Sequence, residues 1–237
     1  GVVLSEALES AGIPSSAVQV VDTPDRELLQ ALLTMDKRID LVVPRGGKGL
    51  VKTVVENSRI PVMKHLDGVC HTFVDASADF DMAQAVVMNA KISRPSTCNA
   101  TETLLVHQEI AEAFLPDCLA ALVKAGVEIR GDEGTRDIAE RVNLSVVPAS
   151  DEDWKTEYND LTLSVKVVTA LHEALAHTNA NGSKHTDAII TRDIASAERF
   201  TLEVEAASVR ASGSPRCADG VEYGSGAEMG SSRDNRR

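Results

Sequence analysis

The stretch VCHTFVDASADFDMAQAVVMNAKISRPSTCNATETLLVH, residues 69–107, decides the fold class. Its first segment, residues 69–75, is largely apolar and predicts a strand, whereas Phe80–Ile92 has the pattern of a helix. Pro95 then ends the helix, because the residue before a proline avoids the helical region. Residues 102–107 predict a second strand. A strand, a helix and a strand in this order indicate a parallel, right-handed α/β unit.

Strand-like and helix-like segments alternate on both sides of this unit. Upstream, Thr23 and Glu27 are spaced as a capping box around Pro24, which predicts a helix to about residue 35. The other upstream segments predict helices at residues 2–10 and up to residue 57, and strands at residues 17–21, 39–43 and 61–64. Downstream we expect strands at residues 127–130, 144–147, 161–168 and 187–191, and helices at residues 109–125, 170–181 and 194–205. The pattern is that of two α/β lobes joined between about residues 81 and 94.

The composition excludes several classes of protein. Lys and Arg total 24 against 36 Asp and Glu, a formal charge of −12, so a nucleic-acid binder is not expected. The apolar runs fall far below the roughly 18 residues of a membrane-spanning helix. No basic and apolar leader is visible, and Gly1 in place of Met indicates that an upstream piece has been removed. Four cysteines without a C-x-x-C pair or a zinc-ligand cluster are typical of free thiols in a reducing cytoplasm.

Cys98 is the strongest chemical candidate among the cysteines. It lies in an irregular segment between a helix and a strand, where its backbone amide could face an oxyanion and Arg94 could lower the pKa of the thiol. Cys70, within a strand, and Cys118, on a helix, are expected in the core as small apolar residues. Cys217 lies in a Gly- and Ser-rich tail that begins near residue 212.

Two further features carry weaker signals. Gly46, Gly47 and Gly49 lie between an apolar segment and a helix, where backbone amides can approach a phosphate. They match neither the dinucleotide nor the Walker pattern, and a tight turn explains them equally well. His185 lies in a loop at a strand end, where binding groups are common. The order of the six histidines indicates no catalytic triad.

Six motifs, in order along the chain, resemble one family. They are residues 44–50 (PRGGKGL), 64–68 (KHLDG), 94–100 (RPSTCNA), 102–106 (ETLLV), 165–168 (VKVV) and 185–193 (HTDAIITRD). The string resembles gamma-glutamyl phosphate reductase, also called glutamate-5-semialdehyde dehydrogenase, of the aldehyde dehydrogenase superfamily. The resemblance implies a partial Rossmann-type cofactor lobe at residues 1–90, an α/β catalytic lobe at residues 91–211 and a divergent return segment at residues 212–237.

The resemblance also implies an activity: reduction of L-glutamyl 5-phosphate to L-glutamate 5-semialdehyde with NADPH, the second step of proline synthesis from glutamate. The glutamyl group would be carried as a cysteine thioester, which divides one difficult displacement into two easier steps. The expected site residues are Cys98 as the nucleophile, Gly46, Gly47, Lys48 and Glu157 at the cofactor, and Arg94, Asn99 and His185 at the substrate. We expect no metal, a cytoplasmic location and a homo-oligomer in the full-length protein.

Departures from the family pattern bear on activity. The segment His65-Leu66-Asp67-Gly68 stands where oxidising members carry Glu-Leu-Gly-Gly, and its lack of a water-activating Glu favours a reductase, whose thioester water would destroy. In the tail, Cys217 replaces an aromatic residue and Ser225 a leucine of the closing motif. Two alternatives follow: the reductase half of a bifunctional pyrroline-5-carboxylate synthase, or a non-catalytic remnant. We expect weak activity from these 237 residues, because half of the cofactor-binding sheet is lacking.

Overall fold

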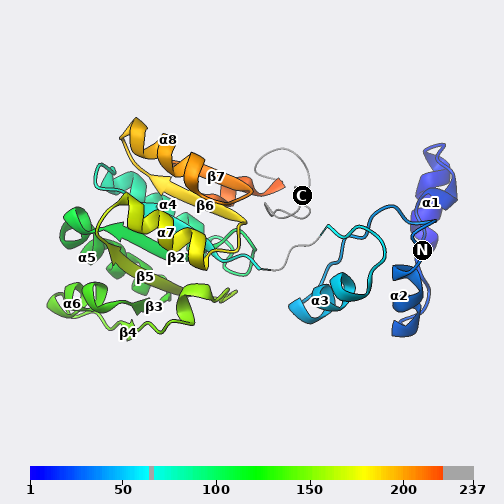
Figure 1. The fold of residues 1–237 in the computed structure, drawn as a ribbon, viewed down its shortest axis with the longest axis horizontal. Helices are drawn as coiled ribbons and strands as arrows, with labels where there is room; N and C mark the ends of the chain where they lie inside the picture. Colours follow the sequence, from blue (N-terminus) through cyan, green and yellow to red (C-terminus); the bar gives the residue numbers. More distant parts are fainter. Residues whose placement is uncertain (64–66, 221–237) are drawn as a thin grey trace. The chain divides into compact units, whose positions relative to one another are not determined.

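The computed structural model describes residues 1–63 and 67–220, which divide into two compact units (Figure 1). One unit comprises residues 1–42 and 52–62, and the other comprises residues 43–51 and the chain from residue 63 onward. Within the described ranges, no helix has the length and apolar character needed to cross a membrane.

The second unit is built on a seven-stranded sheet in which all neighbouring strands are parallel. The order across the sheet is β4-β3-β5-β2-β1-β6-β7. The strands are β1 (Cys70–Val74), β2 (Thr101–His107), β3 (Glu128–Gly131), β4 (Val147–Pro148), β5 (Thr162–Val168), β6 (Thr186–Ile190) and β7 (Ser208–Ala211). Every residue of β1, β2 and β6 is buried, as expected for central strands covered on both faces. The predicted α/β class is confirmed.

Helices cover both faces of this sheet (Figure 1). On one face Leu104 and Val106 of β2 share a core with α4 (Phe80–Ile92), α5 (Gln108–Lys124) and α6 (Glu133–Arg141). On the other face Leu105 packs in a second core with α7 (Leu171–Asn181) and α8 (Ile194–Glu203). Successive residues of a strand point to opposite faces, so one strand supplies side chains to both cores. The sheet is therefore the middle of three layers.

The predicted unit of residues 69–107 is present as β1, α4 and β2. Asp79 caps α4 by accepting a hydrogen bond from the Met82 amide at 3.0 Å, and β1 pairs directly with β2. Because β1 also pairs with β6, it belongs to the centre of the large sheet and not to an upstream lobe. The two compact units divide after residues 42, 51 and 62, and the lobe boundary expected near residue 90 stays a prediction.

Upstream of residue 63 the structure has the three expected α-helices but fewer strands than expected. It contains α1 (Val2–Ser10), η1 (Ser15–Ala17), α2 (Arg26–Leu33) and α3 (Lys48–Asn57). The strands expected at residues 17–21 and 39–43 do not form; within the described part of the chain, Val42 and Val62 make an isolated parallel bridge. A β-branched pattern yields a strand only where a neighbouring strand pairs with it, and Val18, Val20 and Val21 are exposed.

Two further expectations were wrong in detail. The cap of α2 is Asp25, whose carboxylate accepts from the Glu27 amide at 2.9 Å, because the Thr23 hydroxyl is taken up by the Asp25 amide at 3.1 Å. The strand expected at residues 144–147 is reduced to the two residues of β4, which lie at the edge of the sheet. Helix α6 was not predicted.

Candidate active site

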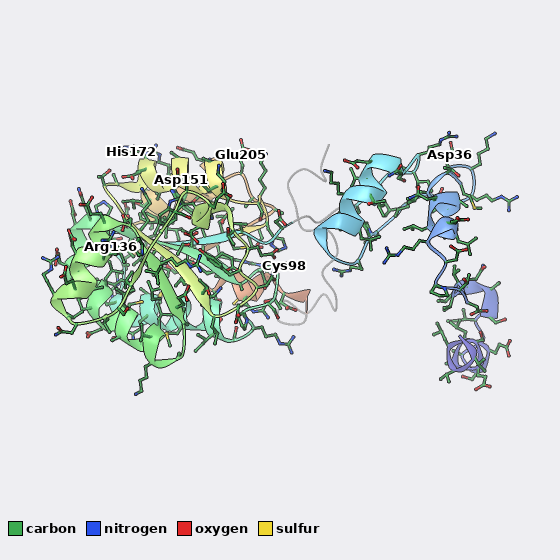
Figure 2. All side chains as sticks on the ribbon, turned by 90° about the horizontal axis from the view of Figure 1, so that it is seen from below. Asp36, Cys98, Arg136, Asp151, His172 and Glu205 are labelled. Carbon is green, nitrogen blue, oxygen red and sulfur yellow. The ribbon has the colours of Figure 1, made fainter. Side chains whose placement is uncertain are left out.

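Cys98 lies in a compact turn between α4 and β2. The Thr97 amide and the Thr97 hydroxyl both donate to the Arg94 carbonyl, at 3.3 and 2.8 Å, and the Ala100 amide donates to the Thr97 carbonyl at 2.9 Å. Cys98 itself is half-buried, whereas Arg94 is exposed. Figure 2 shows Cys98 at one end of the unit, with Arg136 of α6 toward the other. The turn thus holds a partly accessible thiol at the amino end of a central strand.

The backbone of Cys98 is packed against the chain that enters β1. Cys70, the first residue of β1, is fully buried, and its thiol donates to the Cys98 carbonyl oxygen over 3.3 Å. The Cα of Gly68 lies so close that a Cβ added there would overlap the Cys98 carbonyl oxygen and Cα. Glycine is required at residue 68 because of this close approach of two backbones.

Glu157 reaches the same place from the loop before β5. One of its carboxylate oxygens accepts a hydrogen bond from the Gly68 amide at 2.9 Å, across 89 residues of sequence. The structure therefore brings Glu157 to the segment that packs on Cys98. Its assignment to the nicotinamide ribose stays a prediction.

Asn99, next to Cys98, is 1% exposed and accepts a hydrogen bond from Arg216 of the short helix η3 (Pro215–Ala218) through its side-chain oxygen. The Arg216 guanidinium also pairs with Asp219 at 3.2 Å. Among the described residues, neither the Asn99 amide nitrogen nor Arg216 Nε has a hydrogen-bond partner. Sequence reasoning missed Arg216, although it lies two residues before residues 218–220, which resemble the closing motif of the family.

A buried ion pair brackets the nucleophile turn. Lys91 near the end of α4 and Glu102 near the start of β2 are both inaccessible to solvent, with Nζ and Oε2 2.6 Å apart. Burial raises the pKa of Glu102 to about 7, although Lys91 opposes the shift, and burial likewise lowers the pKa of Lys91. The Asn159 amide approaches the other Glu102 oxygen at 3.5 Å. The sequence analysis did not predict this pair, although a lysine within a largely apolar helix is a signal that could have found it.

The remaining predicted residues occupy different settings. His185 is 1% exposed, and its Nδ1 lies 2.8 Å from the Thr186 hydroxyl and 4.0 Å from Cys70 Sγ, so it contacts the buried thiol behind Cys98. Gly46 and Gly47 are exposed in the loop that leads into α3, whose first residue is Lys48. Gly46 has a φ of +150°, which favours glycine.

Part of the expected pattern lies outside the described residues. His65, which begins the segment that stands where oxidising members carry Glu-Leu-Gly-Gly, and Ser225 of the closing motif both fall there. In the described part of the chain, no three His, Cys, Asp or Glu side chains are grouped in a way that could hold a metal ion.

Comparison with protein families gives one match: the aldehyde dehydrogenase family, over residues 1–139. The gamma-glutamyl phosphate reductase of Geobacter metallireducens is 50% identical over 228 residues, which is 96% of this chain and 54% of that protein. The protein of the same name from Caldicellulosiruptor bescii is 47% identical, again over 96% of this chain and 54% of its own. The chain therefore spans about half the length of the curated relatives it matches.

Solved structures agree with this similarity. The crystal structure of gamma-glutamyl phosphate reductase from Thermotoga maritima superimposes with a TM-score of 0.88 at 43% identity, covering 94% of this chain and 53% of that one. An engineered glycolyl-CoA reductase with bound NADP+ superimposes with a TM-score of 0.68 at 18% identity, over 96% of this chain and 58% of that one, which shows a shared fold alone.

Proposed function

The chain belongs to the aldehyde dehydrogenase family, and from this premise we propose that it is the catalytic part of a reductase that converts L-glutamyl 5-phosphate to L-glutamate 5-semialdehyde. The observation that carries the proposal is a half-buried thiol, Cys98, held in a compact turn of a chain that is 50% identical to a gamma-glutamyl phosphate reductase over 96% of its length. A thiolate is the form of cysteine that attacks acyl groups.

The first step belongs to Cys98. Its sulfur attacks the acyl carbon of the glutamyl phosphate, the carbon–sulfur bond forms, and the carbon–oxygen bond to phosphate breaks with its electron pair leaving on the phosphate. The product is a thioester on Cys98. A nicotinamide cofactor, when bound, supplies the hydride that reduces this thioester. The resulting thiohemiacetal then releases the aldehyde as the carbon–sulfur bond breaks and the thiolate of Cys98 is regenerated.

The residues expected at the cofactor have suitable chemistry. Gly46 and Gly47 expose their backbone just before the ten-residue helix α3, and an added Cβ at Gly47 would meet no atom within 4 Å, so a phosphate group has room to approach. Lys48 is the first residue of this helix. The carboxylate of Glu157 can accept hydrogen bonds from ribose hydroxyls. We assign these four residues to NADPH, in preference to NADH, only as part of this proposal.

The nucleophile turn supplies groups for the substrate. Arg94 is exposed beside the turn and is suited to an anionic group of glutamyl phosphate, and Asn99 retains a donor nitrogen without a partner among the described residues. His185, buried behind Cys70, is better placed to support the turn than to contact substrate. A cytoplasmic homo-oligomer remains part of the same proposal.

The test is phosphate-dependent oxidation of glutamate semialdehyde with NADP+, followed as NADPH formation, in a chain that contains residues 1–237. Turnover that is lost in Cys98→Ser but kept in Cys217→Ser supports the proposal, since Cys217 is exposed and stands outside the chemistry. Turnover that survives Cys98→Ser would reject Cys98 as the nucleophile. In a further experiment the upstream cofactor segment of a relative is joined to the chain. If this fusion shows no turnover, the alternative that the chain is a non-catalytic remnant is favoured.

A further inference from the structure

The buried thiol beneath the nucleophile has no part in the chemistry proposed above. Cys70 and Cys98 are 28 residues apart, yet the Cys70 thiol lies 3.3 Å from the carbonyl oxygen of Cys98. That carbonyl belongs to the peptide bond that joins Cys98 to Asn99. A donor at this oxygen therefore acts on the orientation of the nucleophile's own backbone.

The surroundings of Cys70 keep its thiol protonated. Burial raises its pKa to about 11, so at neutral pH the sulfur carries the single proton that a hydrogen-bond donor needs. His185 approaches the same sulfur at 4.0 Å from β6's side and is itself fixed by the Thr186 hydroxyl at 2.8 Å. The Cys70 sulfur thus has a hydrogen-bond acceptor, the Cys98 carbonyl oxygen, and the imidazole ring of His185 lies near it.

We propose that Cys70 is a positioning residue, whose thiol donates to the Cys98 carbonyl and fixes the peptide plane that orients the nucleophile, with His185 supporting the thiol. The catalytic consequence rests on the proposed function, but the hydrogen bond itself does not. A thiol–carbonyl hydrogen bond contributes little to stability. Its effect on rate is larger, because a displacement of about 1 Å at a reacting group can cost on the order of 100-fold.

Two variants separate donation from packing. Cys70→Ser keeps a donor in a buried apolar setting, whereas Cys70→Val fills the space without a donor. If the thiol only packs, valine is the better replacement; if it donates, serine is. We expect Cys70→Ser to keep kcat within about threefold of the parent and Cys70→Val to lower kcat by tenfold or more, with KM for the acyl substrate unchanged in both.

Cys118 provides the matched control. It is also fully buried, and burial alone raises the pKa of its thiol to about 12. It lies on α5 among apolar residues of the core. Cys118→Val is therefore expected to be at least as stable and as active as Cys118→Ser. If serine is the better replacement for activity at residue 70 and valine is the better replacement at residue 118, the Cys70 thiol acts as a hydrogen-bond donor.

A chemical readout tests the hydrogen bond without any turnover. Iodoacetamide labelling of Cys98 in the 237-residue chain, followed by peptide mass spectrometry, is compared with labelling of the exposed Cys217 in the same sample. Loosening the turn exposes the half-buried thiol, so Cys70→Val is expected to raise the Cys98-to-Cys217 rate ratio at least threefold and Cys70→Ser to leave it near the parent value.

The outcomes are distinct. Equal ratios in the two Cys70 variants, or a valine variant with kcat equal to or above that of serine, would overturn the positioning role. If Cys70→Val does not fold, Cys70→Ala, which removes the donor without adding bulk, is read by the same ratio. A raised ratio in a chain that never reduces or oxidises the glutamyl substrate would support the hydrogen bond and reject the proposed function.

Discussion

Gly68→Ala is the sharpest test of how the nucleophile is held. An added methyl group would overlap the carbonyl oxygen and Cα of Cys98, and these are backbone atoms that cannot swing aside as a side-chain end does. Overpacking of this kind costs about 1–3 kcal/mol. Moving residue 68 away also breaks its hydrogen bond to the Glu157 carboxylate, and bonds to charged groups contribute about 1.5–3 kcal/mol.

The expected loss for Gly68→Ala is therefore about 2.5–6 kcal/mol of unfolding free energy. For a unit of this size the melting temperature falls by roughly 5–24 °C, at about 2–4 °C per kcal/mol. Trp154 is the single tryptophan of the chain and lies in the second unit, so its fluorescence follows the unfolding of this unit.

Gly49→Ala is the control for this prediction. Gly49 lies within α3, where an added Cβ meets no atom within 4 Å, so alanine is expected to be neutral or stabilising by up to about 1 kcal/mol. The reasoning about Gly68 is refuted if Gly68→Ala unfolds within about 0.5 kcal/mol of the parent, the size of an ordinary surface substitution. An unchanged rate of iodoacetamide labelling of Cys98 in Gly68→Ala would also refute it.

Three further predictions concern charged and titratable groups. Lys91→Met leaves Glu102 buried without its partner and should lower the free energy of unfolding in urea by about 3–5 kcal/mol. The double variant Lys91→Met/Glu102→Leu should recover most of this stability. Equal stability of the single and double variants would contradict the prediction. Burial lowers the pKa of His177 from 6.5 to about 3. Because the folded protein disfavours the protonated imidazole, the folded state is fully stable above pH 6.5 and loses about 2–4 kcal/mol of unfolding free energy as the pH falls toward 3. A His177→Gln variant should flatten that part of the stability profile, and an unchanged slope would exclude His177 as its source. Arg216→Met removes the partner of the buried Asn99 oxygen and should lower stability by about 1–3 kcal/mol together with kcat; a variant with parental kcat would show that Arg216 does not support the nucleophile turn.

The sequence predicted the centre of the fold better than its edges. Residues 69–107 form β1, α4 and β2 as expected, because each strand contains an apolar run, residues 73–74 or 104–106, that is buried in the sheet. The segment at residues 17–21 has the same β-branched character, but whether it becomes a strand depends on a pairing partner that the pattern cannot supply.

The candidate site was predicted in part for a similar reason. Cys98 could be chosen because its segment is irregular and matches a family motif, and the structure places it half-buried in a compact turn. Gly68 entered the sequence analysis only as part of the motif at residues 64–68. Its close approach to Cys98 is a tertiary contact, which the neighbouring residues in the sequence do not indicate. Arg216 lies 117 residues from Asn99, so that only the folded chain reveals their hydrogen bond.

The contacts that hold the nucleophile share one property: they all lie inside the second unit. Gly68 and Cys70 meet the Cys98 backbone, Glu157 holds Gly68, and Arg216 holds Asn99, from three segments that meet at the amino end of β2. The Lys91–Glu102 pair closes the same turn from α4 and β2, at the desolvation cost of burying two charges. Because burying this pair costs stability, its role is better explained by the fixed geometry that it gives to the turn between α4 and β2. The contacts that set the position of the Cys98 thiol thus lie within the second unit.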